Sequence, residues 1–265
     1  MEKIMRRADF LKKGVNKNGR QYSAWTKEGV KAWILYALHH PEAMAEVHVH
    51  TSDKNIKLNA LMFSTTAGPA TADNLGLGTC GNLPCVGICY AIKTEKFRPS
   101  AMVSNMENVL MLRYAFDRAV AEFETSLRKY SARCGKEGAD TMVRWHESGE
   151  FTPEDSALLD KVSDDFTDAR FYGYTKIAEY YVKYYNHPRI NINWSAWRGM
   201  EIPEEVLACG PLKAFFVEFK DGNNEYLEPY RKGARRCPGL INGEFACNKC
   251  KFACAKNGVK IAREH

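Results

Sequence analysis

The order of apolar and polar positions along the chain switches repeatedly between two spacings. Apolar residues recur at three- and four-residue steps in Trp25–His40 and in Pro99–Tyr130, which predicts an amphipathic helix in each segment. Short apolar runs with the length of buried strands alternate with further helical segments. The predicted strands are Lys57–Ser64, Thr141–Glu150, Ala169–Lys176, Arg189–Ala196 and Lys213–Phe219, and the helices between the later ones are Pro153–Phe166, Tyr180–Tyr185 and Pro203–Cys209.

This alternation of strands and helices, from residue 57 to about 219, predicts βαβ units. We therefore expect an α/β fold with a mostly parallel sheet in the form of a partial (β/α) barrel, although an open doubly wound sheet would satisfy the same pattern. The pattern divides the chain into an N-terminal helical segment (1–56), an α/β domain (57–222) and a Cys-rich C-terminal metal-binding extension (223–265).

Composition constrains the role of the cysteines. The 265-residue chain carries nine of them, and its first residues, Met1–Gly14, lack the apolar core of a secretory signal. No run of about 18 apolar residues is present, so we expect no membrane span. We therefore expect a cytoplasmic protein with reduced thiols, whose clustered cysteines serve metal binding or catalysis. The net charge of +6 permits a phosphate-bearing partner such as nucleic acid without arguing strongly for one.

Three thiols lie close together in Gly76–Lys93. Cys80, Cys85 and Cys89 form the pattern C-x4-C-x3-C in a loop rich in glycine and proline, shortly after the first predicted strand. Because thiolates are the ligands that iron–sulfur clusters use, this loop predicts a 4Fe–4S cluster with one iron open to a fourth ligand. The alternatives are a zinc ion completed by His146 and thiols that serve only packing.

A second group of cysteines closes the chain. Its members are Cys237, Cys247, Cys250 and Cys254, and the C-x2-C core among them is typical of metal sites. Four thiolates suit either a second 4Fe–4S cluster or zinc. If the two groups meet in space, all the clustered cysteines would instead hold one larger cluster.

Polar residues end the predicted strands, which is where ligands bind in barrels and in doubly wound sheets. The cysteine loop is expected at the same edge. We predict catalytic roles, as substrate contacts or in acid–base chemistry, for His146, Glu147 and Lys176. The predicted cofactor-binding residues are Glu150, Tyr174 and Asn193. For His146 and Glu147 an ordinary turn with solvated carboxylates is the alternative.

Four short motifs carry a family resemblance. They are Cys89-Tyr90-Ala91, Glu95-Lys96-Phe97-Arg98-Pro99, Trp145-His146-Glu147-Ser148-Gly149-Glu150 and Phe171-Tyr172-Gly173-Tyr174-Thr175-Lys176. With these motifs, over roughly residues 60–255, the chain resembles the phage-associated gene product 88 family. The resemblance implies a phage or mobile-element protein that works in the cytosol of a host cell.

The chain is also similar, more distantly, to radical S-adenosylmethionine enzymes. Those enzymes place three cysteines in the loop after the first strand of a partial barrel, whereas each gap between the cysteines is one residue longer here. The similarity implies that the open iron of the loop cluster binds S-adenosylmethionine and that the C-terminal cysteines hold an auxiliary cluster.

Three hypotheses follow for the function. The first is an iron–sulfur redox or radical-type enzyme, with an electron donor and a small-molecule or macromolecular substrate. The second is a non-catalytic iron–sulfur protein, such as an electron carrier, a redox sensor or a nucleic-acid accessory protein. The third is a structural protein stabilised by zinc at the C-terminal cysteines.

Overall fold

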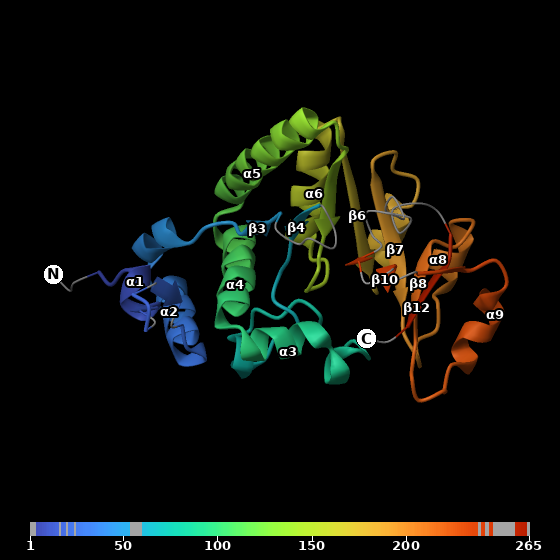
Figure 1. Ribbon diagram of the computed structural model, residues 1–265, viewed down its shortest axis with the longest axis horizontal. Helices are drawn as coiled ribbons and strands as arrows, with labels where there is room; N and C mark the ends of the chain where they lie inside the picture. Colours follow the sequence, from blue (N-terminus) through green and yellow to red (C-terminus); the bar gives the residue numbers. More distant parts are fainter. Residues whose placement is uncertain are drawn as a thin grey trace.

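The computed structural model describes residues 4–15, 17–19, 21–23, 25–53, 60–237, 240–241, 244–245 and 258–263. Within these residues the largest element is an eight-stranded sheet (Figure 1). Its strands are β3 (Thr51–Ser52), β4 (Leu61–Phe63), β5 (Thr141–Trp145), β6 (Ala169–Thr175), β7 (Ile190–Ala196), β8 (Ala214–Glu218), β9 (Arg235–Arg236) and β12 (Lys260–Arg263). Two separate pairs are β1 (Lys13–Val15) with β2 (Gln21–Ser23), and β10 (Leu240–Ile241) with β11 (Glu244–Phe245).

Helices connect most of these strands. The described α-helices are α1 (Arg7–Phe10), α2 (Lys27–His39), α3 (Tyr90–Phe97), α4 (Pro99–Tyr114), α5 (Phe116–Glu137), α6 (Pro153–Asp165), α7 (Ala178–Tyr184), α8 (Glu204–Ala208) and α9 (Glu228–Arg231). Short 3-10 helices are η1 (Pro41–Glu46), η2 (Ala72–Asn74), η3 (Val86–Ile88) and η4 (Glu225–Leu227).

The sheet is mostly parallel, which confirms the α/β prediction. Its strands lie in the order β3-β4-β5-β6-β7-β8-β12-β9. Neighbours from β4 to β8 pair in parallel, as β12 does with β8 and β9, while β3 pairs with β4 in the antiparallel direction. Because β4 to β8 are also consecutive in the chain, their carboxyl ends and the loops that follow them meet at one edge of the sheet.

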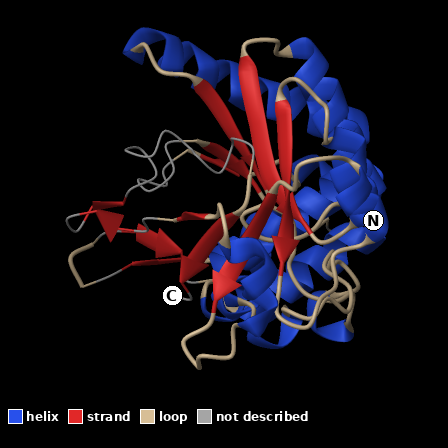
Figure 2. Ribbon diagram, turned by 90° about the vertical axis from the view of Figure 1, so that its right-hand side faces the viewer, coloured by secondary structure: helices blue, strands red, loops and turns tan. Residues whose placement is uncertain are grey.

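The two faces of the sheet differ in what packs on them. One apolar core joins α2, α4, α5 and α6 to inward side chains such as Val143 and Phe171, and a second joins α7 and α8 to Trp194 and Phe216. In Figure 2 the helices lie mostly to the right of the strands. The opposite side chains of the strands form what we call the second face of the sheet. It includes Met142, Arg144, Tyr172, Tyr174, Asn193 and Phe215.

The single helix predicted over Pro99–Tyr130 is wrong, because the segment forms two helices. At the junction Ala115 has φ −148° and ψ 48°, outside the helical region, and α5 then continues past the predicted end to Glu137. No proline or glycine marks this break, and the apolar spacing runs across it, so the sequence pattern did not reveal it.

Several predicted elements agree closely with the structure. β6, β7 and α6 begin and end within one residue of their predicted bounds. The hydroxyl of Thr152 caps α6 by accepting from the N–H of Asp155 at 3.2 Å. The strand predicted over Thr141–Glu150 stops at Trp145, because His146 takes a left-handed φ of 59°. Part of the first predicted strand, residues 57–59, lies outside the described residues.

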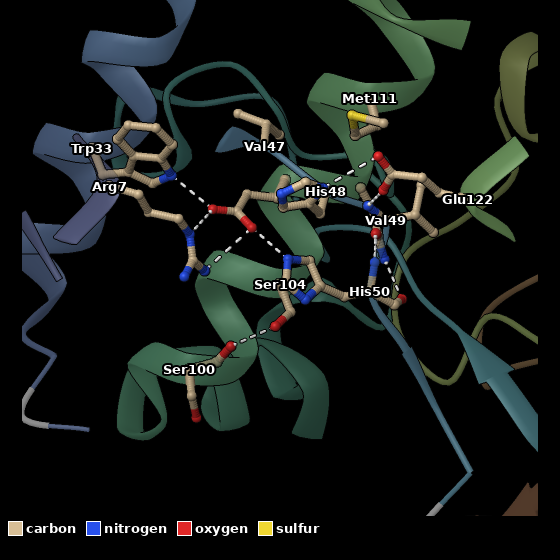
Figure 3. Close-up of polar contacts among 12 residues, drawn as sticks. Arg7, Trp33, Val47, His48, Val49, His50, Ser100, Ser104, Met111 and Glu122 are labelled. Carbon is tan, nitrogen blue, oxygen red and sulfur yellow. Dashed lines mark hydrogen bonds and ion pairs between the residues drawn. The ribbon is translucent and has the colours of Figure 1, made fainter. Parts of the chain in front are cut away.

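A buried carboxylate connects the N-terminal segment to α4 (Figure 3). Oε1 of Glu107 accepts from Arg7 Nε and from Trp33 Nε1, each at 2.7 Å, and Oε2 accepts from His50 Nε2. Burial alone would raise the pKa of Glu107, but the hydrogen bonds and charges of His50 and Arg7 outweigh burial and lower it. Since His50 directly precedes β3, this charged cluster also fixes the outer edge of the sheet.

The C-terminal segment contributes to the sheet as well. β12, from the predicted extension 223–265, pairs with β8 from Lys260 to Arg263. The predicted ligands Cys247, Cys250 and Cys254 lie outside the described residues. No helix in the described part of the chain is long and apolar enough to cross a membrane.

Candidate functional site

The loop that carries the three cysteines, residues 64–89, connects the carboxyl end of β4 to the start of α3; we call it the cysteine loop. It folds back on itself where the N–H of Cys80 donates to Gly68 O at 3.0 Å. A Cβ on Gly78 would lie 2.2 Å from Pro69 O, so this crossing of the backbone requires a glycine. The crossing brings the thiols back toward the edge of the sheet.

The thiols of the cysteine loop lie near one another and near the predicted site residues. Burial raises the pKa of the Cys80 thiol to about 12, and the charges of Glu150, Cys89 and Cys85 raise it further. Burial also raises the pKa of Cys85, although the charge and hydrogen bond of Lys176 oppose this. The structure therefore brings the three loop cysteines, Glu150 and Lys176 into one neighbourhood, as the sequence predicts.

The described residues do not form the ligand set of a single metal ion. No three His, Cys, Asp or Glu side chains within them gather around one point in that way. A zinc ion needs such a set, because its ligands all bind one atom. The thiolates of an iron–sulfur cluster bind different iron atoms and are correspondingly further apart. A cluster on the three cysteines of the loop stays a prediction.

Glu150 joins the end of β6 to the cysteine loop. Its Oε1 accepts from Thr175 Oγ1 at 2.6 Å and from the N–H of Phe151 at 3.0 Å. Its Oε2 accepts from the N–H of Lys176 at 2.9 Å, and its own N–H donates to Thr79 Oγ1 at 2.9 Å. The side chain is buried, and both oxygens accept hydrogen bonds. These contacts suit a residue that positions its neighbours, and a cofactor contact for Glu150 stays a prediction.

Lys176 places a cation beside the thiols. It directly follows β6, and its Nζ donates to Ser195 Oγ on β7 at 3.0 Å. The charge of the same ammonium group acts on the Cys85 thiol and opposes the rise of its pKa. Because Glu150 holds the backbone N–H of this lysine, the position of the charge depends on that carboxylate. Among the predicted catalytic residues, Lys176 has the side chain that reaches the cysteine loop.

The structure places His146 in the apolar core rather than at an open edge. It is 4% exposed, and its Nε2 lies 3.1 Å from Oδ1 of Asp155, a fully buried residue of α6. Its ring also packs edge-on against Phe151 at 4.9 Å between centroids. The Nδ1 atom has no hydrogen-bond partner among the described residues. These contacts connect the end of β5 to α6, and a catalytic role for His146 stays a prediction.

The rest of the Trp145–Glu150 motif crosses the start of the cysteine loop. We call this crossing the loop junction, and it is made of Ser64 and Thr65 from the cysteine loop and Glu147, Ser148 and Gly149 from the motif. The hydroxyl of Ser64 accepts from the N–H groups of Glu147 and Ser148 at 3.1 and 3.3 Å. The N–H of Thr65 donates to Ser148 O at 3.1 Å. Gly149 has φ 92°, and a Cβ on it would lie 2.0 Å from Thr65 Oγ1. The motif therefore holds the start of the cysteine loop.

Glu147 also receives a contact from the far end of the cysteine loop. Its backbone carbonyl accepts from the hydroxyl of Tyr90 at 2.6 Å. Since Tyr90 is the first residue of α3, this bond ties the end of the loop to the same junction that holds its start. The hydrogen bonds described for Glu147 are made by its backbone, so a catalytic role for its half-buried carboxylate stays a prediction.

Tyr174 and Asn193 are register partners on β6 and β7 and lie on the second face of the sheet. The ring of Tyr174 packs against Phe215 at 5.3 Å between centroids and lies 5.8 Å from the guanidinium carbon of Arg144. Asn193 is buried, and its Nδ2 lies 3.4 Å from Gly173 O. Both predicted cofactor-binding residues therefore face the same side of the sheet.

Sequence reasoning gave no role to Glu95, which holds the cysteine loop from the side of α3. This buried carboxylate accepts at Oε1 from the N–H of Ala67 at 3.1 Å and from Asn105 Nδ2 at 2.8 Å. Burial raises its pKa to about 7, against the effect of these hydrogen bonds. Its place in the motif Glu95–Pro99 was the one available signal. Arg144, a charge inside an apolar strand, is a second residue that the sequence reasoning overlooked.

The C-terminal cysteines are described only in part. Cys237 is half-buried at the end of β9, where its N–H donates to Ile261 O at 2.7 Å. The other three, Cys247, Cys250 and Cys254, are not among the described residues. A second cluster, or a zinc ion, at these cysteines stays a prediction.

Comparison with known proteins gives the family. The chain matches the family described as gene product 88 over residues 21–199. It belongs to the gene product 88 family. A Gene 88 protein of Mycobacterium phage D29 is 29% identical over 213 residues, covering 75% of this chain and 85% of that protein. A Gene 88 protein of Mycobacterium phage L5 is 26% identical over 212 residues, with the same shares. No solved structure shows a significant match.

The gene product 88 match confirms the resemblance and changes its extent. It begins earlier than the resemblance drawn from the motifs and ends at residue 199. The matched segment contains the cysteine loop, the loop junction and Lys176. The C-terminal cysteines lie beyond it, so the family relationship covers the first predicted metal site and not the second.

Replacing Gly149 by alanine should destabilise the protein by about 2 kcal/mol or more, because the new Cβ would meet Thr65 in a backbone conformation that suits glycine. Urea unfolding followed by circular dichroism measures this. The matched control is Gly135→Ala in α5, where a Cβ meets nothing within 4 Å. That variant should be neutral or more stable by up to about 1 kcal/mol. Equal unfolding midpoints for the two variants would contradict the role of Gly149.

The stability of the protein should fall between about pH 4.5 and pH 7 through Glu95. The pKa of this carboxyl is about 7 in the folded state against 4.5 ordinarily, so the folded state binds the proton more tightly. Its contribution is fully present below the ordinary pKa and is lost as pH rises through the folded value, up to about 3 kcal/mol.

Glu95→Gln tests this pH dependence, because glutamine keeps an acceptor for Ala67 and Asn105 but does not ionise. The free energy of unfolding of Glu95→Gln, measured in urea at several pH values, should change less with pH than that of the parent protein. Glu124→Gln on α5, beside Arg128, is the control and should follow the parent protein. Parallel pH curves for Glu95→Gln and the parent protein would show that Glu95 does not titrate in this range.

Proposed function

We propose that this protein binds an iron–sulfur cluster through Cys80, Cys85 and Cys89. The observation that carries the proposal is the proximity of three thiols in one loop at the carboxyl ends of parallel strands. Three thiolates are a ligand set that suits iron and sulfide, and they leave one iron for another ligand.

The surroundings of the thiols support this assignment. A thiolate-bound cluster is rich in negative charge, and Lys176 lies beside Cys85 where it would offset part of that charge. Glu150 and Ser195 hold the backbone and the ammonium group of this lysine. In this proposal Lys176 is a positioning and charge-balancing residue, and Glu150 acts through it.

The catalytic version of the proposal is a redox or radical-type enzyme built on a partial (β/α) barrel. Two features favour a barrel over a doubly wound sheet: the consecutive order of β4 to β8, and the two helical cores on one face. When bound to such a cluster, S-adenosylmethionine supplies a C–S bond that one-electron reduction can break. Tyr174 and Asn193, on the second face, would contact the cofactor or substrate, and Glu147 would lie at the edge of the site.

A non-catalytic iron–sulfur protein is the alternative, as an electron carrier, redox sensor or nucleic-acid accessory protein. It is favoured by the way the acidic and basic groups at the strand ends are already used. His146 is buried against Asp155, and both oxygens of Glu150 accept hydrogen bonds. A zinc ion at the C-terminal cysteines would add a structural role in either case.

The setting that we propose is a phage or another mobile element, with the protein acting in the host cytosol. Its support is the family relationship, since two relatives are proteins of mycobacteriophages. The proposed cluster would then need an electron donor from the host or from the same element.

Protein purified without oxygen should be brown and should contain iron and acid-labile sulfide. Cys80→Ser, Cys85→Ser and Cys89→Ser should each lower the iron bound to the loop at least several-fold, because a serine hydroxyl replaces a thiolate ligand. The control is Cys209→Ser at the end of α8, which should keep the full iron content. The four variants are made in a background with Cys247, Cys250 and Cys254 replaced by serine, so that any C-terminal cluster does not mask the loss.

Two outcomes of the metal analysis would overturn the cluster assignment. One is zinc without iron or sulfide in protein prepared under strictly anaerobic conditions. The other is an equal iron content in Cys80→Ser and Cys209→Ser, which would show that iron is bound elsewhere.

The catalytic version makes a separate prediction. Reconstituted protein with S-adenosylmethionine and dithionite should release 5′-deoxyadenosine and methionine in equal amounts, measured by liquid chromatography. Cys85→Ser, which lacks one cluster ligand, should release less than a tenth as much. An intact, reducible cluster that yields no 5′-deoxyadenosine would reject the radical-type enzyme and favour the electron-transfer or sensor alternative.

A further inference from the structure

The second face of the sheet has a composition that cluster binding by itself does not explain. At the described strand positions on this face, in β5 to β8 and β12, there is no Asp or Glu. The same positions supply the cations Arg144, Arg170 and Lys260. The Glu147 carboxylate acts on Arg144 from the end of β5, but the strand positions themselves carry only positive charge, which suits an anionic ligand.

Aromatic and amide side chains lie between these cations. Arg144, Tyr174, Asn193 and Phe215 come from the four consecutive strands β5, β6, β7 and β8. Tyr174 and Phe215 form a ring pair, and the Arg144 guanidinium lies near the ring of Tyr174. Three strand spacings of about 4.8 Å separate the outer two of these strands, roughly 14 Å in all. A mononucleotide can cover a span of that size.

Arg144 supplies a donor that the fold itself does not use. Its Nε is buried and has no hydrogen-bond partner among the described residues. Its charge acts on Tyr90, whose hydroxyl donates to Glu147 O at 2.6 Å. Arginine presents several N–H groups in a planar fork that matches phosphate oxygens. A phosphate beside Arg144 would satisfy the unused donor.

We propose that the second face binds a nucleotide, with its phosphate at Arg144 and its base against Tyr174 and Phe215. Tyr174 and Phe215 are half-buried, whereas Tyr172 and Asn193 on the same face are each only 2% exposed, so the area open to a ligand is small and suits a nucleotide better than a long strand of nucleic acid. This site does not require the iron–sulfur cluster, so the two proposals can fail independently.

Isothermal titration calorimetry of the full chain with each nucleoside triphosphate, with and without reconstituted cluster, tests the proposal. At least one nucleoside triphosphate should bind. The nucleoside that lacks its phosphates, and inorganic triphosphate, which lacks the nucleoside, should each bind at least ten-fold more weakly. Arg144→Met should weaken the nucleotide at least ten-fold. The control is Arg128→Met on the exposed surface of α5, which should stay within two-fold of the parent protein.

A second variant keeps the test valid if Arg144→Met does not fold, as judged by circular dichroism. Tyr174→Leu removes the ring but leaves the charges, so it should weaken the nucleotide at least several-fold and leave inorganic triphosphate unchanged. The proposal is overturned if no nucleoside triphosphate binds at millimolar concentration. It is also overturned if inorganic triphosphate, S-adenosylmethionine or a single-stranded DNA oligonucleotide binds more tightly than every nucleotide.

Discussion

The close contact of two backbone segments at the loop junction is the constraint on which the candidate site depends. Gly149 approaches Thr65 so closely that a methyl group does not fit between them, and Ser64 accepts two N–H groups from the loop after β5. A hydrogen bond to a buried backbone group is costly to leave unmade, so these contacts fix the path of both loops together. The cysteine loop starts at this crossing and is held again by Tyr90 at its far end.

The carboxylates near the site mainly accept hydrogen bonds from backbone N–H groups of neighbouring residues. The carboxylate of Glu150 accepts from the N–H of Lys176, and that of Glu95 accepts from the N–H of Ala67. The backbone N–H of Glu150 also donates to the hydroxyl of Thr79. A carboxylate can accept several hydrogen bonds at once, which makes it effective at fixing irregular segments that lack a partner strand. The thiols are therefore exposed to two opposite charges, that of Lys176 at Cys85 and that of Glu150 at Cys80. The chemistry of the site then depends on what the thiols bind.

The sheet separates two environments with different physical roles. On one face apolar side chains and helices form the cores that stabilise the fold, and the burial of that surface is the main favourable contribution to folding. On the other face, cations, tyrosines and amides lie among apolar residues such as Met142 and Phe215 at alternate positions of the same strands. Because successive side chains of a strand point to opposite faces, this alternation gives the two faces different chemistry. The cysteine loop lies at the edge where the two environments meet.

The sequence by itself determined the order of strands and helices, the parallel sheet and the grouping of Cys80, Cys85 and Cys89, because apolar spacing and residue spacing are local properties. It also predicted that Lys176 lies near the loop, through the rule that carboxyl ends of parallel strands share an edge. Only the tertiary structure decided that His146 is buried against Asp155 and that Glu150 is a backbone acceptor. It also revealed the break at Ala115. Those outcomes depend on contacts between residues far apart in the chain, and hydrogen bonds of that kind leave no periodic pattern in a sequence.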